Sequence, residues 1–545
     1  MILAAVLVVV PIAMLASSVL TPSTSVWADL WRTRLPDEII STIVLVVGVT
    51  ACSIVLGTGL AWLVSAHRFP GRRVLAWALV LPLAVPGYIL GFVTLSVFGV
   101  AGPLQEWWRD RFGQDAWFPD TRSMPMAILV LSLTLYPYVY LLARAAFLSQ
   151  SRTLIEAARG LGMSRARAIV RVGVPLARPA ILGGVALALM EALADFGTVN
   201  LLGVRTFTDA IYRVWFEAFD RDAAMQLATL LVSVTLTLLA LERLLRGRAR
   251  HAQLAARGDL VRPVRLRGVA AIAAAVLPLV LVVLVVGAPL VQLGVWSVQS
   301  IRDGLLPIEF GASVRNSLLL AGMSAVLVPV TAVLLAYGAR SSRSRVAAVA
   351  ARSATIGYGL PGSVVAVAVI VPLGWIDRRL DGAFGTGLLL TGTVIGLFYA
   401  YLVRFLALAW GAVESSLIRI PRQLDDAARG LGADKLDVLA RVHVPLLRSG
   451  LATAALLVFV EVMKELPATL LLRPLGGDTM AIAVWQATTE SLFETAALPA
   501  LMIVLVGLLP VALMIRLSGR VGASEVEASP AAAAWVDEPT ASVAA

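Results

Sequence analysis

Four carboxylates stand at matching positions in two apolar stretches of the sequence. Glu191 precedes Asp195 by four residues, and Glu461 precedes Glu465 by the same number. Residues four apart lie on one face of a helix. Ionisable groups at membrane depth are costly, and they usually face a protein interior or a water-filled path. Hard cations prefer oxygen ligands. We therefore predict that these acids line a cation translocation pathway, with Asp195 and Glu465 as candidates for transient metal contact and no firm metal site.

The same residues allow a plainer interpretation, in which the acids pair with Arg or Lys and hold the protein together. Lys464 follows Glu461 by three residues and supports that alternative in the second stretch. Gly197 and Pro467 come directly after the acids, and each weakens a helix. A broken helix beside carboxylates is typical of a binding or gating site in transporters. A kink that serves packing is the alternative.

The composition shows what must position these acids. The chain has 545 residues, of which 59% are hydrophobic and 14% are charged, whereas a soluble domain has about 25% charged residues. We therefore predict an all-α polytopic membrane protein. A helical span needs about 20 apolar residues. Twelve stretches qualify as transmembrane helices: 2–20, 39–66, 74–100, 124–149, 180–202, 223–245, 269–294, 314–339, 350–373, 386–413, 450–472 and 497–518.

The charge pattern predicts the topology. The net charge is +11, and the basic residues fall in loops on alternate sides of the spans. Such residues favour the cytoplasmic side. We therefore predict a multi-pass protein of the cell membrane with both termini in the cytoplasm. A basic patch with interleaved aromatic residues is missing, which argues against nucleic acid as a partner. Four regions are predicted: a first membrane-embedded half (1–245), a basic cytoplasmic linker (246–268), a second half (269–518) and a disordered C-terminal tail (519–545).

Several kinds of chemistry find no support in the sequence. Cys52 is the only cysteine, and the three histidines are scattered without metal-ligand spacing. The phosphate-binding pattern G-x-x-x-x-G-K-[ST] does not occur. No arrangement of a nucleophile and a base suggests an enzyme. We expect that the chain binds no cofactor, and that any ATP hydrolysis takes place on a separate chain.

An internal repeat covers the two most basic loops. Residues 156–178 (EAARGLGMSRARAIVRVGVPLAR) and 426–448 (DAARGLGADKLDVLARVHVPLLR) are identical at 12 of 23 positions, with a constant offset of 270. The acids described above follow the same offset. An even number of spans separates the two copies, so they share one topology. This is a parallel duplication of two six-helix halves.

The loop sequence predicts a helix, a sharp turn at a glycine, which we call the elbow, and a second helix. Gly162 and Gly432 stand where a chain leaving a helix turns left-handed at low cost. Ser164 and Asp434 follow as N-caps of the second helix. Pro175 and Pro445 are expected to kink or end that helix before the next span. An ordinary surface helix that closes a loop is the alternative, but a connector would not need the same elbow twice. The charges differ between the copies, which indicates either different surroundings or neutral drift.

This loop resembles the signature of binding-protein-dependent ABC importer permeases, in which Glu-Ala-Ala is followed by Gly and then by an apolar-x-apolar-Pro ending. Asp426 departs from the usual Glu. The resemblance implies the type I ABC importer transmembrane fold and a short helix that docks into a cytoplasmic ATPase homodimer. It also implies an extracytoplasmic substrate-binding protein as a partner. The residues assigned by the resemblance to ATPase coupling are Glu156, Ala157, Ala158, Gly162, Asp426, Ala427, Ala428 and Gly432.

The surroundings of the acids are similar to the ferric iron permeases of this superfamily, which are also fused twelve-span chains. The similar segments are ADFGT at 194–198 and MKELPAT at 463–469. Fused thiamine permeases share the architecture, and polyamines, phosphonates and oxyanions remain open as substrates. Carboxylates repel oxyanions, which favours a cation. A secondary transporter is a further alternative, although it would need no docking loop. The segments 206–222 and 476–496 are predicted outer or gate helices.

Overall fold

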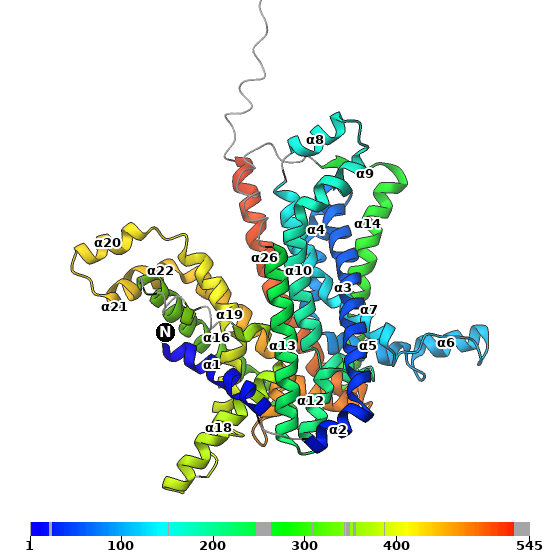
Figure 1. The fold of residues 1–545 in the computed structure, drawn as a ribbon. Helices are drawn as coiled ribbons and strands as arrows, with labels where there is room; N and C mark the ends of the chain where they lie inside the picture. Colours follow the sequence, from blue (N-terminus) through cyan, green and yellow to red (C-terminus); the bar gives the residue numbers. More distant parts are fainter. Residues whose placement is uncertain are drawn as a thin grey trace, which may run out of the picture.

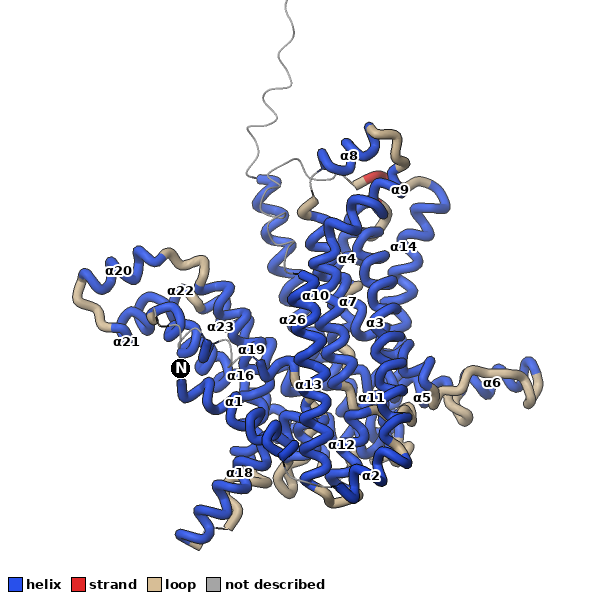
Figure 2. The backbone as a smooth tube through the Cα atoms, viewed as in Figure 1, coloured by secondary structure: helices blue, strands red, loops and turns tan. Residues whose placement is uncertain are grey.

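The computed structural model of the chain is almost entirely helical. It describes residues 2–20, 24–150, 152–246, 263–307, 309–342, 344, 349–351, 356–385 and 387–527. Long helices run side by side, with α8 at one end of the molecule and α2 and α12 at the other (Figure 1). The segments between the helices are mostly short turns (Figure 2). The prediction of an all-α chain is therefore confirmed.

The first half has the following elements in order: α1 (Ile2–Ser17), η1 (Ser18–Leu20), α2 (Thr24–Thr33), α3 (Leu35–Ala66), β1 (His67–Arg68), α4 (Arg72–Ala78), η2 (Leu81–Ala84), α5 (Gly87–Phe98), α6 (Pro103–Phe112), α7 (Met124–Leu148), α8 (Arg152–Gly160), α9 (Arg165–Ala168), η3 (Ile169–Gly173), α10 (Val174–Ala194), α11 (Gly197–Leu201), α12 (Phe207–Phe216) and α13 (Arg221–Arg246).

The second half has these elements in order: β2 (Val264–Arg265), α14 (Gly268–Val282), η6 (Val283–Gly287), α15 (Ala288–Arg302), α16 (Phe310–Ser341), η7 (Ile356–Gly359), α18 (Gly362–Phe384), α19 (Val394–Leu417), α20 (Arg422–Gly430), α21 (Lys435–Asp437), η8 (Val438–His443), α22 (Val444–Leu446), α23 (Arg448–Met463), α24 (Pro467–Leu472), α25 (Met480–Thr489) and α26 (Phe493–Glu527).

Eight helices of the described residues are long and apolar enough to cross a membrane, or nine if the bent pair around α22 and α23 forms one span. The structure therefore supports a multi-span protein without confirming the number of twelve. Among the other predicted stretches, 2–20 contains the shorter helix α1, 223–245 lies in α13, and 350–373 contains the break between η7 and α18.

Helix α1 of the first half, and α15 at the end of the long first helix Gly268–Arg302 of the second half, each contact both halves. Helix α1 lies against α13 of its own half and α18 of the second half, whereas α15 lies against α26 of its own half and α5 of the first. Tyr399 of α19 donates a hydrogen bond from its hydroxyl to the Leu7 carbonyl at 2.5 Å. A helix that is apolar on all sides is suited to such burial. The exchange fastens the two halves together.

The ends of the halves differ in part from expectation. β1 and β2 form a two-stranded parallel sheet, which ties the described end of the linker to the first half. Residues 247–262 of the linker lie outside the described residues. Helix α26 continues to Glu527, so the helix includes residues 519–527, which we expected in a disordered tail; residues 528–545 lie outside the described residues.

Candidate functional site

The helix that carries the first pair of acids breaks directly after them. Helix α10 ends at Ala194, and α11 begins at Gly197. The Asp195 carboxylate bridges the break, because Oδ1 accepts hydrogen bonds from the Thr198 and Val199 amides at 3.0 and 3.1 Å. Its Oδ2 accepts the Thr198 hydroxyl at 2.7 Å. Asp195 therefore supplies acceptors for amides that the start of a helix leaves unpaired.

The second half repeats this break with one difference. Helix α23 ends at Met463, and α24 begins at Pro467. Oε1 of Glu465 accepts the Ala468 amide at 3.0 Å, while Oε2 lies 3.3 Å from Nε of Arg404 on α19. Glu465 is thus both a helix cap and half of an ion pair. The predicted breaks after the acids are confirmed in both halves.

A second pair of broken helices faces the first and was not predicted from the sequence. Pro86-Gly87 and Pro361-Gly362 each follow a 3-10 turn and start a helix, α5 and α18. A Cβ at Gly87 would lie 2.6 Å from the Thr198 hydroxyl, and one at Gly362 would lie 2.5 Å from Oε1 of Glu465. A side chain at Gly87 would therefore collide with Thr198, and one at Gly362 would displace the charged ends of Arg404 and Glu465. The repeated Pro-Gly pair in two apolar stretches was the available signal.

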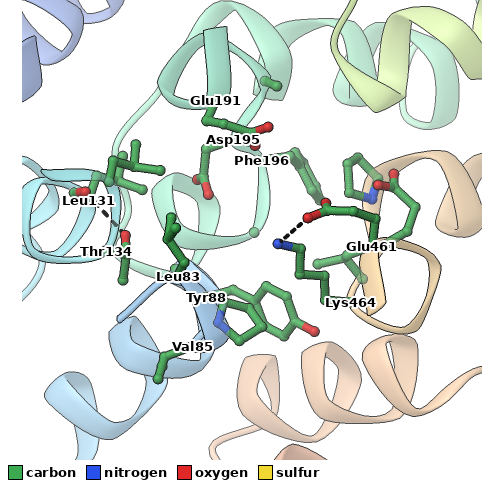
Figure 3. A pocket seen from close by; sticks show the side chains of 18 of the residues that line it. Leu83, Val85, Tyr88, Leu131, Thr134, Glu191, Asp195, Phe196, Glu461 and Lys464 are labelled. Atoms are coloured by element: carbon green, nitrogen blue, oxygen red, sulfur yellow. Dashed lines mark hydrogen bonds and ion pairs between the residues drawn. The ribbon is translucent and has the colours of Figure 1, made fainter. Parts of the chain in front are cut away.

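All four predicted acids line one cavity between the halves. The cavity measures about 110 Å³, and its charged lining residues are Glu191, Asp195, Arg404, Glu461, Lys464 and Glu465. This space exceeds the minimum of about 15 Å³ that a water molecule needs. Figure 3 shows the side chains of Glu191, Asp195, Glu461 and Lys464 converging on it from helices of both halves. The shared register thus brings the acids together, although their role in transport remains a prediction.

The plainer interpretation also holds in part. Lys464 Nζ lies 2.8 Å from Oε1 of Glu461, and Arg404 pairs with Glu465. Within the described residues, Glu191 forms neither a hydrogen bond nor an ion pair. Four carboxylates against two cations leave the lining acidic. The acids of the second half are therefore paired, and those of the first half face the cavity without a cation of their own.

The cavity does not form a resident metal centre in the part of the chain that the structure describes, where no group of three or more His, Cys, Asp or Glu side chains gathers around a common point. Tyr88 lines the cavity as well, and its hydroxyl has no hydrogen-bond partner among the described residues although the side chain is buried. An unsatisfied buried hydroxyl is costly. Tyr88 therefore has one donor and acceptor left for a substrate or for water.

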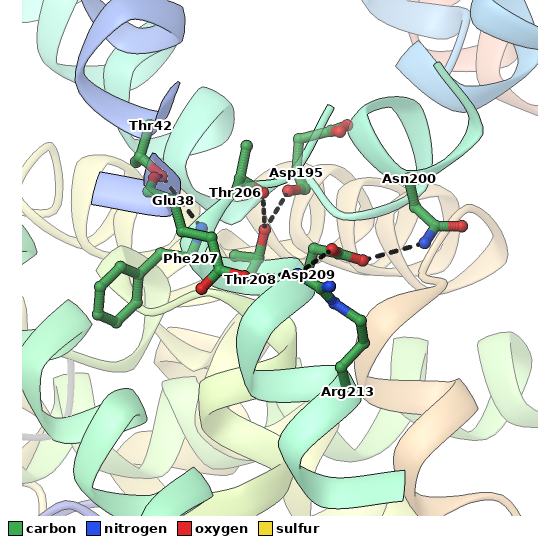
Figure 4. Close-up of polar contacts among 9 residues, drawn as sticks. All are labelled: Glu38, Thr42, Asp195, Asn200, Thr206, Phe207, Thr208, Asp209 and Arg213. Carbon is green, nitrogen blue, oxygen red and sulfur yellow. Dashed lines mark hydrogen bonds and ion pairs between the residues drawn. The ribbon is translucent and has the colours of Figure 1, made fainter. Parts of the chain in front are cut away.

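A polar cluster supports Asp195 from behind (Figure 4). The Thr208 hydroxyl donates to the Asp195 carbonyl at 2.7 Å. One helical turn further along α12, Arg213 lies 2.5 Å from Glu38 Oε1 on α3 and 3.0 Å from Asp209 Oδ2. Glu38 is only 2% exposed. The segment 206–222, predicted as an outer or gate helix, therefore contains a helix, α12, that is largely buried and anchored to α3.

Replacing Arg213 with methionine should destabilise the protein strongly. The substitution leaves Glu38 and Asp209 buried without their cation, and breaking a buried ion pair in this way costs about 3–5 kcal/mol. Thermal unfolding in detergent, followed by intrinsic fluorescence, measures the loss. The triple variant Glu38→Gln/Asp209→Asn/Arg213→Met removes all three charges and should recover much of this loss. If Arg213→Met is as stable as the parent, the buried ion pairs of Arg213 with Glu38 and Asp209 do not stabilise the protein.

The repeated loops fold as predicted at their elbows. Gly162 and Gly432 adopt φ values of 84° and 87°, which favour glycine. The Asp434 carboxylate accepts the Asp437 amide at 2.7 Å, and the Ser164 hydroxyl accepts the Arg167 amide at 3.4 Å. Both predicted N-caps are confirmed, and the hydrogen bond of Ser164 is the longer of the two. Helix α8 and helix α20 precede the two elbows.

The prolines behave differently in the two halves. The helix pair around α22 and α23 is bent by 76° just after Pro445, as predicted, whereas Ile169–Ala194 passes through Pro175 as one helix. The prediction that Pro175 kinks or ends the helix is therefore wrong. A π-helical segment, η3 or η8, precedes the proline in both halves, and each proline stands in the first turn of the helix that follows. The two halves differ after the proline, because α10 continues to Ala194 whereas α22 ends at Leu446.

The second loop is anchored by a charged cluster that the sequence analysis did not identify. Asp425, on the buried side of α20, accepts a hydrogen bond from Arg340 Nε of α16 at 2.9 Å and lies 2.8 Å from His443 Nε2. Burial raises the pKa of Asp425, but the Arg340 hydrogen bond and the charges of His443 and Arg340 outweigh it, so this pKa lies below its ordinary value. The neighbouring Asp426, the predicted coupling residue, is exposed.

The predicted coupling residues mostly face away from the protein. Of the eight, Ala158 is buried, Ala428 is half-buried, and the others are exposed: Glu156, Ala157, Gly162, Asp426, Ala427 and Gly432. Two large apolar side chains stand beside them at the elbows. Leu161 is 83% exposed and Leu431 is 90% exposed, at equivalent positions of the repeat. Each elbow therefore presents polar and apolar surface.

The chain belongs to the family of binding-protein-dependent transport system inner membrane components, whose model matches it twice, over residues 53–250 and 329–522. It is thus a fused two-half permease of a binding-protein-dependent ABC importer, a multi-pass inner membrane protein and a transport subunit rather than an enzyme. The resemblance seen in the sequence is confirmed. The family implies an ATPase and a substrate-binding protein as partners.

Known relatives differ in what their names say they transport. The Fe(3+)-transport system permease protein FbpB 2 of Haemophilus influenzae is 27% identical over 493 residues, which cover 89% of this chain and 90% of that protein. The "Probable molybdenum ABC transporter permease protein" of Haloferax volcanii is 32% identical over 34% of this chain and 66% of its own length. The sulfate transport system permease protein CysT of Escherichia coli is 28% identical over 39% and 78%.

Proposed function

We propose that this permease takes ferric iron from an extracytoplasmic binding protein and passes it inward by alternating access, driven by a separate ATPase homodimer. The single observation that carries the proposal is the cavity between the halves, in which four carboxylates face only two cations. Hard cations of high charge prefer oxygen ligands. The similarity to the iron permease extends over both halves, which adds support.

An oxyanion is the strongest competing substrate, because the shorter matches include sulfate and molybdenum permeases. An acidic cavity repels oxyanions, and this repulsion favours the cation. Thiamine or a polyamine is the alternative among cations.

The two elbows are the proposed contacts with the ATPase. Both combine exposed residues of the family signature with an exposed leucine. The buried cluster of Asp425, Arg340 and His443 ties α20 to α16, so a displacement of α20 by the ATPase would be passed to the spans. This arrangement requires that both elbows and both termini lie in the cytoplasm.

Uptake by proteoliposomes tests the substrate. The permease, its ATPase and its binding protein are reconstituted together, and ATP-dependent uptake of radioactive iron, molybdate, sulfate, thiamine and putrescine is compared. We expect uptake of iron only, supplied on the binding protein. Uptake of molybdate or sulfate without iron would refute the proposal that the substrate is a cation. Uptake of thiamine or putrescine instead of iron would keep the cation proposal and refute iron as the substrate. Iron uptake without the ATPase would indicate a secondary transporter.

A further inference from the structure

Lys464 occupies an unusual position for a basic residue in this protein. Its side chain enters the cavity between the acids of the two halves, where Nζ lies 2.8 Å from Glu461 (Figure 3). It is 23% exposed, and Glu461 is 22% exposed. The pair is therefore neither sealed in the protein nor free in solvent. Both groups remain accessible to a molecule that enters the cavity.

The choice of lysine is also unusual for this sequence. Of the 45 Lys and Arg residues, only Lys435 and Lys464 are lysine. The guanidinium of arginine holds a carboxylate in a planar fork, whereas the ammonium of lysine is a compact point charge on a flexible stem. Arg404, in the same cavity, holds Glu465 beside the fixed cap of α24. Lys464 is the group in the lining that resembles a small mobile cation.

The repeat shows that this cation has no counterpart in the first half. The offset of 270 relates Lys464 to Ala194, and both line the cavity. The same offset relates Arg404 to Thr134, which lines the cavity as well. Glu191 of the first half lines this cavity together with Glu461, Arg404 and Lys464 of the second half. One ammonium therefore lies within the field of acids from both halves.

We propose that Lys464 is a tethered counter-ion that determines which cations the cavity accepts. Its ammonium holds Glu461 and screens Glu191 when no substrate is present, and an arriving cation must displace it. Attraction to a carboxylate grows with the charge of the cation. A trivalent ion therefore displaces the ammonium more readily than a monovalent or divalent ion. The ammonium lowers the affinity of every entering cation, so that only a cation of high charge retains enough affinity to occupy the cavity.

This inference rests on the proposed cation substrate, and its test uses competition. ATP-dependent uptake of radioactive iron, supplied well below the concentration that saturates uptake, is measured in the reconstituted complex with increasing Mn²⁺, using the same unmodified binding protein throughout. In Lys464→Ala, we expect Mn²⁺ to inhibit at a concentration about tenfold lower than in the parent, which corresponds to about 1.4 kcal/mol. Loss of a residue that only supports the fold would lower the amount of active protein without changing the Mn²⁺ concentration that inhibits uptake.

The repeat provides a matched control. Ala194→Lys/Lys464→Ala moves the ammonium to the equivalent place in the other half. We expect this variant to need the same Mn²⁺ concentration as the parent for inhibition of iron uptake. If Lys464→Ala does not insert into the membrane, Lys464→Gln is measured in the same way. Parental discrimination in the single variant, or no restoration in the transposed one, overturns the inference. Glu461→Gln/Lys464→Ala removes both members of the pair, and we expect iron uptake in this variant to stay as sensitive to Mn²⁺ as in Lys464→Ala. If its sensitivity returns to that of the parent, Lys464 only neutralises Glu461 and the inference is overturned.

The parental protein separates this inference from the proposed function. If the unmodified complex transports an oxyanion, the proposed cation substrate is wrong, and the question of Lys464 falls with it. If the unmodified complex transports iron while the Lys464 variants discriminate normally, the cation substrate stands and only the role of Lys464 is refuted.

Discussion

Replacing both Leu161 and Leu431 with aspartate will separate the ATPase from the permease and stop ATP-driven uptake. These leucines are 83% and 90% exposed at equivalent positions of the two elbows. Large exposed apolar side chains in a repeated motif are suited to a partner surface. Removal of an interface anchor costs about 2 kcal/mol or more, and two distant sites add. A loss of about 4 kcal/mol lowers affinity about a thousandfold.

Co-purification of the ATPase with tagged permease from detergent measures this loss, and uptake by vesicles measures its consequence. Leu475→Asp is the matched control, because Leu475 is also fully exposed but lies between α24 and α25, away from the elbows. That variant should retain the ATPase. Normal co-purification of the Leu161→Asp/Leu431→Asp protein would refute docking at the elbows. Each single substitution should give an intermediate loss.

The repeat made much of this structure predictable. A constant offset of 270 relates loops and acids alike, and both elbows, both caps and both breaks after the acids follow from local residue preferences. Glycine at a left-handed position and Asp or Ser at a helix start act within a few residues of themselves. Such features need no knowledge of the rest of the fold. The convergence of the acids needed only the added assumption that the halves face each other.

The partners of those acids were less accessible. Arg404 stands in an apolar stretch far along the chain from Glu465, and an arginine at that depth was itself a signal of function. The Asp425 cluster joins three helical segments that only the tertiary fold brings together. The helix continues through Pro175 but bends after Pro445, although a π-helical turn precedes both prolines, and the local sequence does not reveal this difference. Exchange of α1 and α15 between the halves is a property of topology.

Asp195→Asn will lower iron uptake about tenfold to a hundredfold while insertion and ATPase binding remain normal. Asparagine caps a helix nearly as well as aspartate, so the amides of Thr198 and Val199 keep their acceptor. The substitution removes only the negative charge, and an interaction with a charged group contributes about 1.5–3 kcal/mol. Uptake of radioactive iron per assembled complex is the measurement.

The equivalent change at Glu465 is a poorer test, because Glu465→Gln leaves Arg404, which is 13% exposed, without its partner. A loss of uptake there would combine instability with loss of charge. The better companion is Thr198→Val, which removes the hydroxyl that donates to Asp195 and keeps the carboxylate. It should retain most uptake. Equal uptake in Asp195→Asn and the parent would show that this carboxylate serves only as a helix cap, and would remove it from the proposed pathway.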